Sequence, residues 1–299
     1  MNDMTPDKQN ANTRQSDTLA WGIIELQVTD LDRAVEFWTN ALGLVNRHLD
    51  TPGVALGTKD RTLIILHAGA TKPVAAPFTG MYHVAIGVRT QSEFSRILAR
   101  LIHLKVHVSP TDHLMAKSLY IADPDGLEIE ITYETPERFG QYGDMSKGLI
   151  LYDADGQPHS GRDPLDVPAE LSYAQGADVM ANIAEDSYLA HLHFKVAAIE
   201  PALDWFTTLG FSRHLTLSNW GFADMNAGAE NTHRLAMNIW AGPNRPQAPN
   251  DMARLVGYEL LALVPEVYNA ATTLSQGEGA KQGQDPNGVA VTLTPAYST

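Results

Sequence analysis

The sequence predicts an α+β protein whose two halves repeat a βαβββ module, giving four modules that form curved mixed sheets or half-barrels. Two observations indicate duplication: a strand followed by a helix ending in Leu-Gly occurs twice, and so does a turn that leads into a strand. The third observation is size, because 299 residues with 44% apolar composition suit two domains of about 130–150 residues, each with its own core.

The repeated strand and helix are the first landmark. An alternating strand at 23–28 (IIELQV) precedes a helix at 31–44 (LDRAVEFWTNALGL), and a strand at 191–196 (HLHFKV) precedes a helix at 199–211 (IEPALDWFTTLGF). Both helices carry apolar residues at helical spacing, and the Leu-Gly pair suits a left-handed C-cap. The ends of the two strands lie 196 − 28 = 168 residues apart.

The repeated turn is the second landmark. Asp-Pro-Asp-Gly at 123–126 and Asp-Pro-Asn-Gly at 285–288 both favour a turn before a strand, and they lie 285 − 123 = 162 residues apart. Two landmarks at nearly the same offset indicate duplication. Each half also divides again, because a strand at 82–88 (YHVAIGV) with a helix from about 91 to 104 has a counterpart beginning at 257–264 (GYELLALV).

The segment between the halves fits none of the four modules. It is rich in Gly, Asp, Pro and Ser, which is typical of a linker that packs on the surface. The polar N-terminus lacks the apolar core of a signal peptide and is interpreted as a flexible leader. The predicted organisation is a leader at 1–17, a first domain at 18–135, a linker at 136–187 and a second domain at 188–299.

Charge and composition exclude several classes of partner. The formal net charge of −14 opposes binding to nucleic acid or to an anionic membrane, and no apolar run approaches the roughly 20 residues of a membrane span. The absence of cysteine excludes disulfides, thiolate metal sites and cysteine nucleophiles. We therefore expect a cytoplasmic protein that binds small molecules, with no nucleic-acid or membrane partner, and we leave a homo-oligomer open.

Candidate metal ligands come from comparing the modules. When the four first strands are aligned on their last valine, at 28, 88, 196 and 264, the residues five positions earlier are Ile23, His83, His191 and Glu259. Glu130 lies four residues after the first turn glycine, between two isoleucines, and Thr292 is its counterpart in the second half. A carboxylate in such a strand is costly to bury unless it is paired or binds a metal.

Two imidazoles and one carboxylate form a facial triad that leaves three positions open on an octahedral metal. His83, Glu130 and His191 are thus predicted to hold one divalent ion; Fe(II) suits such a site, and Mn(II), Ni(II) or Zn(II) also fit. His193 lies on the same face as His191 and is either the true ligand or a residue that lines the pocket. Five histidines have no repeat-supported place and are interpreted as structural or surface residues: His67, His103, His107, His214 and His233.

Together these motifs resemble the vicinal oxygen chelate superfamily, which includes extradiol ring-cleaving dioxygenases, glyoxalase I and the bleomycin-resistance proteins. The resemblance is strongest to the two-domain catechol 2,3-dioxygenases of the bacterial type. It rests on YHVAI at 82–86, DHLMAKSLYIADPDGLEIEI at 112–131, HLHFKV at 191–196 and NIWAG at 238–242. It covers nearly the whole chain apart from the N-terminal leader.

The resemblance implies roles for individual residues. His83, Glu130 and His191 would be the iron ligands. Tyr120, ten residues before Glu130, is similar to the active-site tyrosine that hydrogen-bonds developing oxygen charge, and His113 is similar to the histidine that exchanges protons with substrate or oxygen. The candidates for substrate binding are His193, Asn238 and Trp240, although Trp240 equally suits packing on the sheet. The chain departs from the extradiol pattern in its last module, where Glu259 and Thr292 replace a histidine and a glutamate.

The expected activity is Fe(II)-dependent extradiol cleavage of a catechol or hydroquinone-like aromatic by dioxygen. Two alternatives remain open: a non-catalytic small-molecule binding protein of the same fold, and a glyoxalase-like metal-dependent isomerase or lyase. The complete triad favours an enzyme, and the absence of a fourth protein ligand favours the dioxygenase. Since the ligands come from the second and third modules, we expect those two modules to share one curved sheet and the first and fourth to pair with each other.

Overall fold

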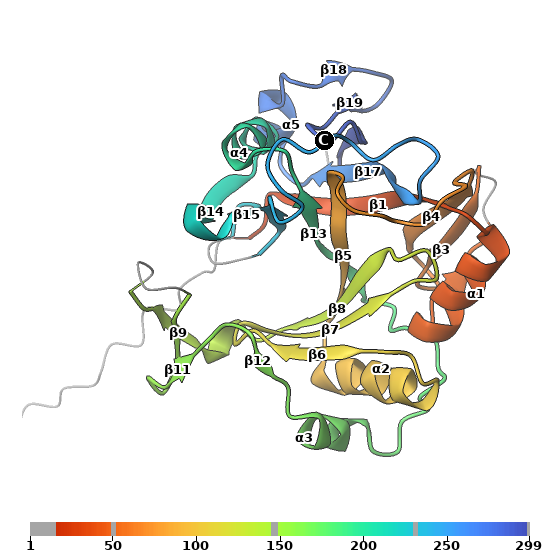
Figure 1. Cartoon of the computed structure of the whole chain (residues 1–299), viewed down its shortest axis with the longest axis vertical. Helices are drawn as coiled ribbons and strands as arrows, with labels where there is room; N and C mark the ends of the chain where they lie inside the picture. The colour runs from red at the N-terminus through yellow and green to blue at the C-terminus, as the bar shows by residue number, and fades with distance from the viewer. Residues whose placement is uncertain (1–15, 49–51, 145–148, 230–232, 298–299) are drawn as a thin grey trace, which may run out of the picture.

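The computed structural model describes residues 16–48, 52–144, 149–229 and 233–297. Two large curved sheets of mixed strand direction form the molecule, and the longer helices lie at its periphery (Figure 1). The predicted α+β class with curved mixed sheets is confirmed. The expected leader at 1–17 lies almost wholly outside the described residues.

Four modules are present, each with a strand, a helix and then three further strands. The first comprises β1 (Leu19–Val28), α1 (Leu31–Leu42), β2 (Val45–Asn46), β3 (Val54–Gly57) and β4 (Thr62–Ala68). The second comprises β5 (Gly80–Val88), α2 (Gln91–His103), β6 (Ser109–Asp112), β7 (Ala116–Ala122) and β8 (Glu128–Glu134). The third comprises β13 (Tyr188–Lys195), α4 (Ile199–Thr207), β14 (Ser212–Leu217), β15 (Phe222–Asn226) and β16 (Leu235–Asn238). The fourth comprises β17 (Arg254–Ala262), α5 (Pro265–Ala270), β18 (Ser275–Gln276), β19 (Lys281–Gln284) and β20 (Ala290–Pro295).

The modules pair across the two halves of the chain. One sheet has the order β18-β19-β20-β17-β1-β4-β3-β2 and combines the fourth and first modules. The other has the order β12-β6-β7-β8-β5-β13-β16-β15-β14 and combines the second and third. In each sheet the two modules meet through an antiparallel pair, β1 with β17 and β5 with β13. The expected pairing of modules is therefore confirmed, and each half of the sequence contributes to both sheets.

Capping residues at both ends of α1 explain why its predicted boundaries are close to the observed ones. The Asp30 carboxylate caps α1 by accepting from the Arg33 N–H, and Gly43 ends the helix with a φ of 75°. The fully buried Trp38 anchors its inner face. In the third module the helix is shorter than predicted, because α4 ends at Thr207, three residues before Gly210.

The two Asp-Pro turns are built alike. Asp123 Oδ1 accepts from the backbone N–H groups of Asp125 and Leu127, at 2.9 and 2.8 Å. Asp285 Oδ1 accepts from Asn287 and Val289, at 2.8 and 2.9 Å. Both aspartates are buried, so each carboxylate satisfies backbone donors that turn the chain into the last strand of its module. The duplication seen in the sequence is repeated at the level of single hydrogen bonds.

The segment between the halves has more structure than a plain linker. It contains a small sheet of β9 (Phe139–Tyr142), β10 (Leu151–Asp153) and β11 (Pro158–His159), then β12 (Asp163–Pro164) and α3 (Val167–Leu171). Short 3-10 turns lie in this segment at Pro136–Arg138 and Ser172–Ala174. Another lies outside it, at Ser218–Trp220 between β14 and β15. Strand β12 pairs with β6, which adds an edge strand to the sheet of the second and third modules.

Buried polar contacts fix this segment against α2. Arg96 and Arg100 donate to the Ala181 carbonyl oxygen at 3.0 and 2.7 Å. The buried Glu170 carboxylate accepts from Ser95 and Lys117, at 3.0 and 2.6 Å. The segment therefore returns over one edge of the sheet, pairs residues 163 and 164 with β6 and brings the His159 side chain to Asp112.

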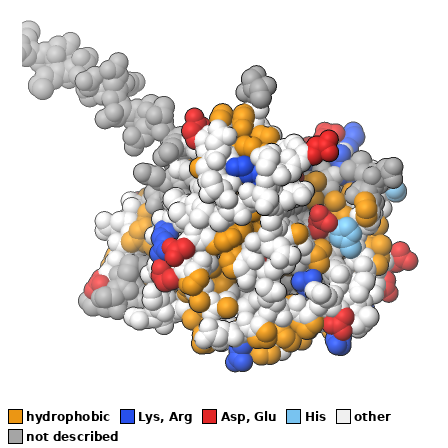
Figure 2. Space-filling model, turned by 90° about the horizontal axis from the view of Figure 1, so that it is seen from above, with side chains coloured by type: hydrophobic (Ala, Val, Ile, Leu, Met, Phe, Trp, Pro, Cys, Tyr) orange, Lys and Arg blue, Asp and Glu red, His pale blue; other side chains and the backbone are white. Residues whose placement is uncertain are grey.

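The core continues between the two sheets. Phe194 of β13 lies 5.8 Å from Tyr258 of β17, and Trp21 of β1 lies 5.5 Å from the same tyrosine, measured between ring centroids. Seen from above, hydrophobic side chains form separate patches and acidic and basic side chains are interspersed (Figure 2). No helix among the described residues is long and apolar enough to cross a membrane.

Candidate metal centre

Three neighbouring strands bring the predicted triad together. His83 lies on β5, Glu130 on β8 and His191 on β13, and the sheet order places β5 between the other two. The Nε2 atoms of His83 and His191 each lie 3.0 Å from Glu130 Oε2, and 3.2 Å from each other. All three side chains are buried. In the described part of the chain, this is the one group of three His, Cys, Asp or Glu residues whose ligand atoms converge enough to hold a metal ion.

Irregular pairing between β5 and β13 aims the ligands. His193 pairs with His83, whereas the next residue of β13, Phe194, pairs with Met81, so β5 has one extra residue at Tyr82. A bulge of this kind bends a strand and redirects its side chains, and such bulges occur often beside active sites. A second irregularity occurs where Leu189 pairs with Ile86 and His191 pairs with Ala85.

Burial and hydrogen bonding set the protonation of the triad. Burial alone would raise the pKa of Glu130, but the adjacent His191 and His83 outweigh it and hold that pKa well below its usual value. Burial chiefly lowers the pKa of His191 to about 4. Ser118 donates to Glu130 Oε1 at 2.5 Å, which leaves Oε2 facing the imidazoles. At neutral pH the triad thus has an anionic carboxylate and a neutral His191 imidazole, the forms that bind a divalent metal.

Aromatic contacts hold the His83 ring. Its Nδ1 atom is buried and has no hydrogen-bond partner among the described residues. The ring instead lies 5.6 Å from Tyr120 and 4.9 Å from His193, both nearly edge-on. Packing therefore replaces the hydrogen bond that more often orients a metal-binding imidazole.

His113 and Tyr120 form a hydrogen-bonded pair beside the triad. His113 Nδ1 donates to the Gly161 carbonyl oxygen at 2.7 Å, so Nε2 is free to accept from the Tyr120 hydroxyl at 2.9 Å. Burial lowers the pKa of His113, while burial and the nearby Glu130 raise the pKa of Tyr120 well above its usual value. Leu114, next to His113, has a left-handed φ of 68°, a strained conformation that recurs at functional sites.

The three proposed substrate-binding residues lie on the other side of the triad. Asn238 Nδ2 donates to His193 Nε2 at 2.9 Å, and Asn238 Oδ1 accepts from the Trp240 backbone N–H at 3.0 Å. Because its Nε2 atom is engaged by Asn238, His193 does not join the ligand cluster. Trp240 is 50% exposed and its ring lies 5.5 Å from Tyr82. We use the name aromatic wall for Tyr82, His193, Phe222 and Trp240, whose rings contact one another.

Two histidines that the sequence analysis interpreted as structural or surface residues flank Asp224, and one of them, His233, lies beside the triad. The His233 ring is 4.6 Å from the His191 ring, and His233 Nδ1 lies 2.9 Å from Asp224 Oδ2. His214 Nδ1 lies 3.1 Å from Asp224 Oδ1. Burial would raise the pKa of Asp224, but these two hydrogen bonds hold it well below its usual value. The available signal was Asp224 itself, an acid between apolar residues of a buried strand.

The comparison of the fourth module with the others needs a correction. Val88 lies two residues before Thr90, the N-cap of α2, whereas Val264 is itself the N-cap of α5. The two strands are therefore equivalent with a shift of two residues, and Gly257, not Glu259, matches His83. The ladders agree, because Glu259 pairs with Thr292 as Ala85 pairs with Glu130. The alignment on the last valine was wrong here because β17 ends at Ala262.

Comparisons with known proteins agree with this geometry. Residues 21–131 match the model of the Glyoxalase/Bleomycin resistance protein/Dioxygenase superfamily. A catechol-2,3-dioxygenase of Bacillus subtilis (strain 168) is 26% identical over 277 residues, covering 89% of this chain and 93% of the relative. These two findings make the chain similar to members of that superfamily, through residues 21–131 and through one relative along most of its length, as the sequence motifs predict.

Solved structures show the same fold. Glyoxalase I from Zea mays superposes with a TM-score of 0.54 and 15% identity, covering 93% of each chain. A putative dioxygenase from Bacillus subtilis subsp. subtilis str. 168 superposes with a TM-score of 0.53 and 12% identity, covering 92% of this chain and 85% of the other. At such low identity these likenesses concern the fold alone.

Proposed function

We propose that the protein is an extradiol ring-cleaving dioxygenase that uses a divalent metal, Fe(II), to cleave a catechol or hydroquinone-like aromatic. The observation that carries this proposal is the convergence of His83 Nε2, His191 Nε2 and Glu130 Oε2 in a buried cluster. The name of the Bacillus subtilis relative supports the same chemistry. Three protein ligands, rather than four, leave room for the substrate and dioxygen.

The donor set fits the metal. Two imidazole nitrogens and a carboxylate oxygen are ligands that Fe(II) accepts, and no backbone rearrangement is needed to bring them together. When bound, the metal would supply a Lewis acid at which the two vicinal oxygens of the substrate and dioxygen meet. The chain itself has to orient the ring, exclude water and move protons.

His113 and Tyr120 are placed to move a proton. The Tyr120 hydroxyl donates to His113 Nε2, and His113 keeps its Nδ1 proton on Gly161. A lowered pKa keeps His113 neutral, so a substrate hydroxyl that takes the place of Tyr120 at His113 Nε2 can give up its proton there. The Tyr120 hydroxyl, protonated because its pKa is raised, is then released from His113 and can donate its hydrogen bond to oxygen charge that develops beside it.

Across the triad, His233 and the aromatic wall enclose the ring. Asp224 holds the His233 imidazole through its Nδ1 atom, and the same imidazole ring packs edge-on against the His191 ring. Asn238 fixes His193 in the same way. These contacts favour a flat aromatic substrate over the alternatives of a glyoxalase-like reaction or simple sequestration, because aromatic faces and edges line the approach to the triad.

The test is oxygen uptake by the full chain after anaerobic loading with Fe(II), using catechol as substrate. Labelled dioxygen should place both of its atoms in one ring-opened product, cleaved beside the diol. Glu130→Gln should abolish uptake, whereas Glu259→Gln, a matched change in the other sheet, should not. Turnover without incorporation of labelled oxygen, or tight catechol binding without turnover, would establish the isomerase or binding alternative instead.

A further inference from the structure

Lys195 is half-buried beside the candidate site, and its ammonium group lies over the ring of Tyr82 but pairs with no acid among the described residues. Within the described residues it makes no ion pair or hydrogen bond. Other lysines at comparable places are satisfied: Lys117 lies 2.6 Å from Glu170, and Lys281 donates to the carbonyl oxygen of Tyr268 at 2.6 Å. Because an ammonium group loses hydration when it is buried, an unpaired one indicates that a ligand is missing.

The position of Lys195 relates it to the metal triad. Side chains alternate along β13, so Lys195 lies on the same face as His191 and His193. At about 3.3 Å per residue, its Cα atom lies roughly 7 Å along the strand from the level of the His193–His83 pair. Its ammonium group lies 5.8 Å from the centroid of the Tyr82 ring, at the outer end of the aromatic wall.

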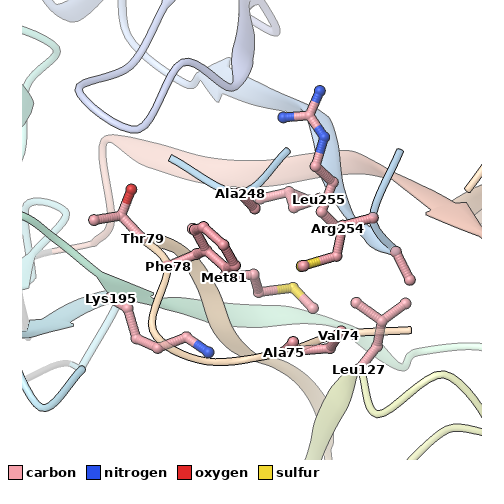
Figure 3. A pocket seen from close by; sticks show the side chains of 13 residues that line it. Val74, Ala75, Phe78, Thr79, Met81, Leu127, Lys195, Ala248, Arg254 and Leu255 are labelled. Carbon is pink, nitrogen blue, oxygen red and sulfur yellow. The ribbon is translucent and has the colours of Figure 1, made fainter. Parts of the chain in front are cut away.

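The surroundings of Lys195 are mostly apolar. Its side chain extends into a pocket lined by Val74, Phe78, Met81 and Leu255 (Figure 3). The acid that affects it most is Glu128, which is exposed and lies beyond ion-pair distance, so it does not neutralise Lys195 directly. Desolvation therefore dominates at this lysine and lowers its pKa, while an anion bound beside it would restore the lost interaction.

A second cation, Arg162, lies close enough to Tyr82 and Tyr120 to affect their pKa values. Arg162 follows Gly161, whose carbonyl oxygen accepts from His113. Its side chain is exposed and has no partner within the described part of the chain, and its charge lowers the pKa of Tyr82 and of Tyr120 against larger effects of burial. Lys195 and Arg162 thus place two cations near Tyr82, against the exposed acid Glu128, in a protein whose net charge is −14.

We propose that the preferred substrate is a catechol that carries a carboxylate on a short flexible arm, and that Lys195 binds this carboxylate while Arg162 attracts it. The inference rests on the proposed ring-cleaving function and adds the class of ring substituent. An arm is proposed because Lys195 lies two residues along β13 from His193, beyond the level of the triad. A flexible link of two or three atoms spans the gap.

The test compares 3-(3,4-dihydroxyphenyl)propionate with its neutral amide, using the Fe(II)-loaded full chain. The wild type should favour the acid, and Lys195→Met should reduce the acid-to-amide ratio of kcat/KM by about 10- to 100-fold, the range of a charge-assisted hydrogen bond. The loss should appear in KM. Lys195→Arg should retain the preference, and Lys59→Met, which removes an exposed lysine between β3 and β4, should leave the ratio unchanged.

Arg162→Gln should lower kcat/KM for the acid only a few-fold, with the effect disappearing at high salt, as expected for steering by an exposed charge. Equal use of acid and amide by the wild type, or an unchanged ratio in Lys195→Met, overturns the inference.

Binding of 3-phenylpropionate, measured by calorimetry, separates failure of this inference from failure of the proposed function. If no catechol is cleaved but the wild type binds this ligand at least tenfold more tightly than Lys195→Met, the carboxylate site stands and the dioxygenase proposal fails. Equal affinities, or no binding to either protein, refute the carboxylate site.

Discussion

His191 and His193 lie on the same face of β13, yet their Nε2 atoms have different partners. His191 Nε2 faces Glu130 at 3.0 Å, whereas His193 Nε2 accepts from Asn238 at 2.9 Å. His83→Ala and His191→Ala should therefore lose most of the bound metal, while His193→Ala should keep it. Metal content after anaerobic loading with Fe(II) and gel filtration measures this. Retention of metal by His191→Ala together with its loss in His193→Ala shows that the ligand is the other histidine.

The hydrogen bond between Tyr120 and His113 gives a second prediction at this scale. Tyr120→Phe removes a hydrogen-bond donor and His113→Ala removes an acceptor, and neither change alters a metal ligand. Both variants should therefore keep the metal and lower kcat by about 10²–10⁴-fold. His103→Ala, which removes an exposed histidine at the end of α2, serves as the control. A kcat within twofold of the wild type in both active-site variants means that the pair is structural.

The triad could be read from the sequence because its members occupy repeated places in the modules. His83 and His191 stand at the same position of two equivalent strands, and Glu130 follows a turn that occurs twice. His233 and Asp224 had no such signal, since their approach to His191 depends on how the β15–β16 hairpin lies across the sheet. Lys195 was visible only as part of an alternating strand, and its lack of an acidic partner depends on which side chains the fold brings beside it.

At the scale of elements, the Asp-Pro turn before β8 makes the stability of the folded protein depend on pH. Burial is the main cause that raises the pKa of Asp123 from 3.8 to about 6. The folded protein therefore binds this proton more tightly than the unfolded chain, so the carboxyl group contributes stability below about pH 4 that is lost as pH rises through 6. Asp123→Asn accepts the same two backbone N–H groups and does not titrate.

We therefore expect Asp123→Asn to gain about 2–3 kcal/mol of unfolding free energy relative to the wild type between pH 4 and pH 7. Asp123→Ala should be about 1–3 kcal/mol less stable than Asp123→Asn at every pH, because two backbone donors lose their acceptor. Urea unfolding at several pH values measures both differences. If the difference in unfolding free energy between Asp123→Asn and the wild type is the same at every pH from 4 to 7, the raised pKa of Asp123 is contradicted.

Element boundaries were predicted best where a local cap decides them. Asp30 and Gly43 frame α1 by their own chemistry, so the start of this helix was placed correctly and its end within two residues. The first strand of each module begins earlier than predicted, since pairing with a neighbouring module, rather than local sequence, sets its start: β17 begins at Arg254 opposite Gln27 of β1. The β12–β6 pairing in the connecting segment involves two residues on each side and leaves no pattern in the sequence.

For the whole molecule, the pairing of modules determines where a metal can bind. The second and third modules meet through β5 and β13, which brings one histidine from each to Glu130. The first and fourth meet in the same way through β1 and β17, but Ile23 and Gly257 occupy the two histidine positions. This arrangement could be predicted from the location of the ligands, because no other pairing lets the three residues meet.

The chain should accordingly bind one metal ion, and that ion should stabilise the molecule by joining its two halves. At a free concentration a hundredfold above Kd, a ligand that binds only the folded state adds about 2.7 kcal/mol, which raises Tm by several degrees. Metal analysis should give one Fe(II) per chain, and calorimetry should show a higher Tm with metal than without. Glu130→Gln should show neither effect and Glu259→Gln should show both, because Glu259 bonds Thr294 in the other sheet rather than a histidine. Two ions per chain, or a Tm increase that survives in Glu130→Gln, would place metal outside the triad.

The joining role also predicts that metal slows separation of β5 from β13, measured as slower hydrogen exchange at Val84 and Leu192, which pair across that junction.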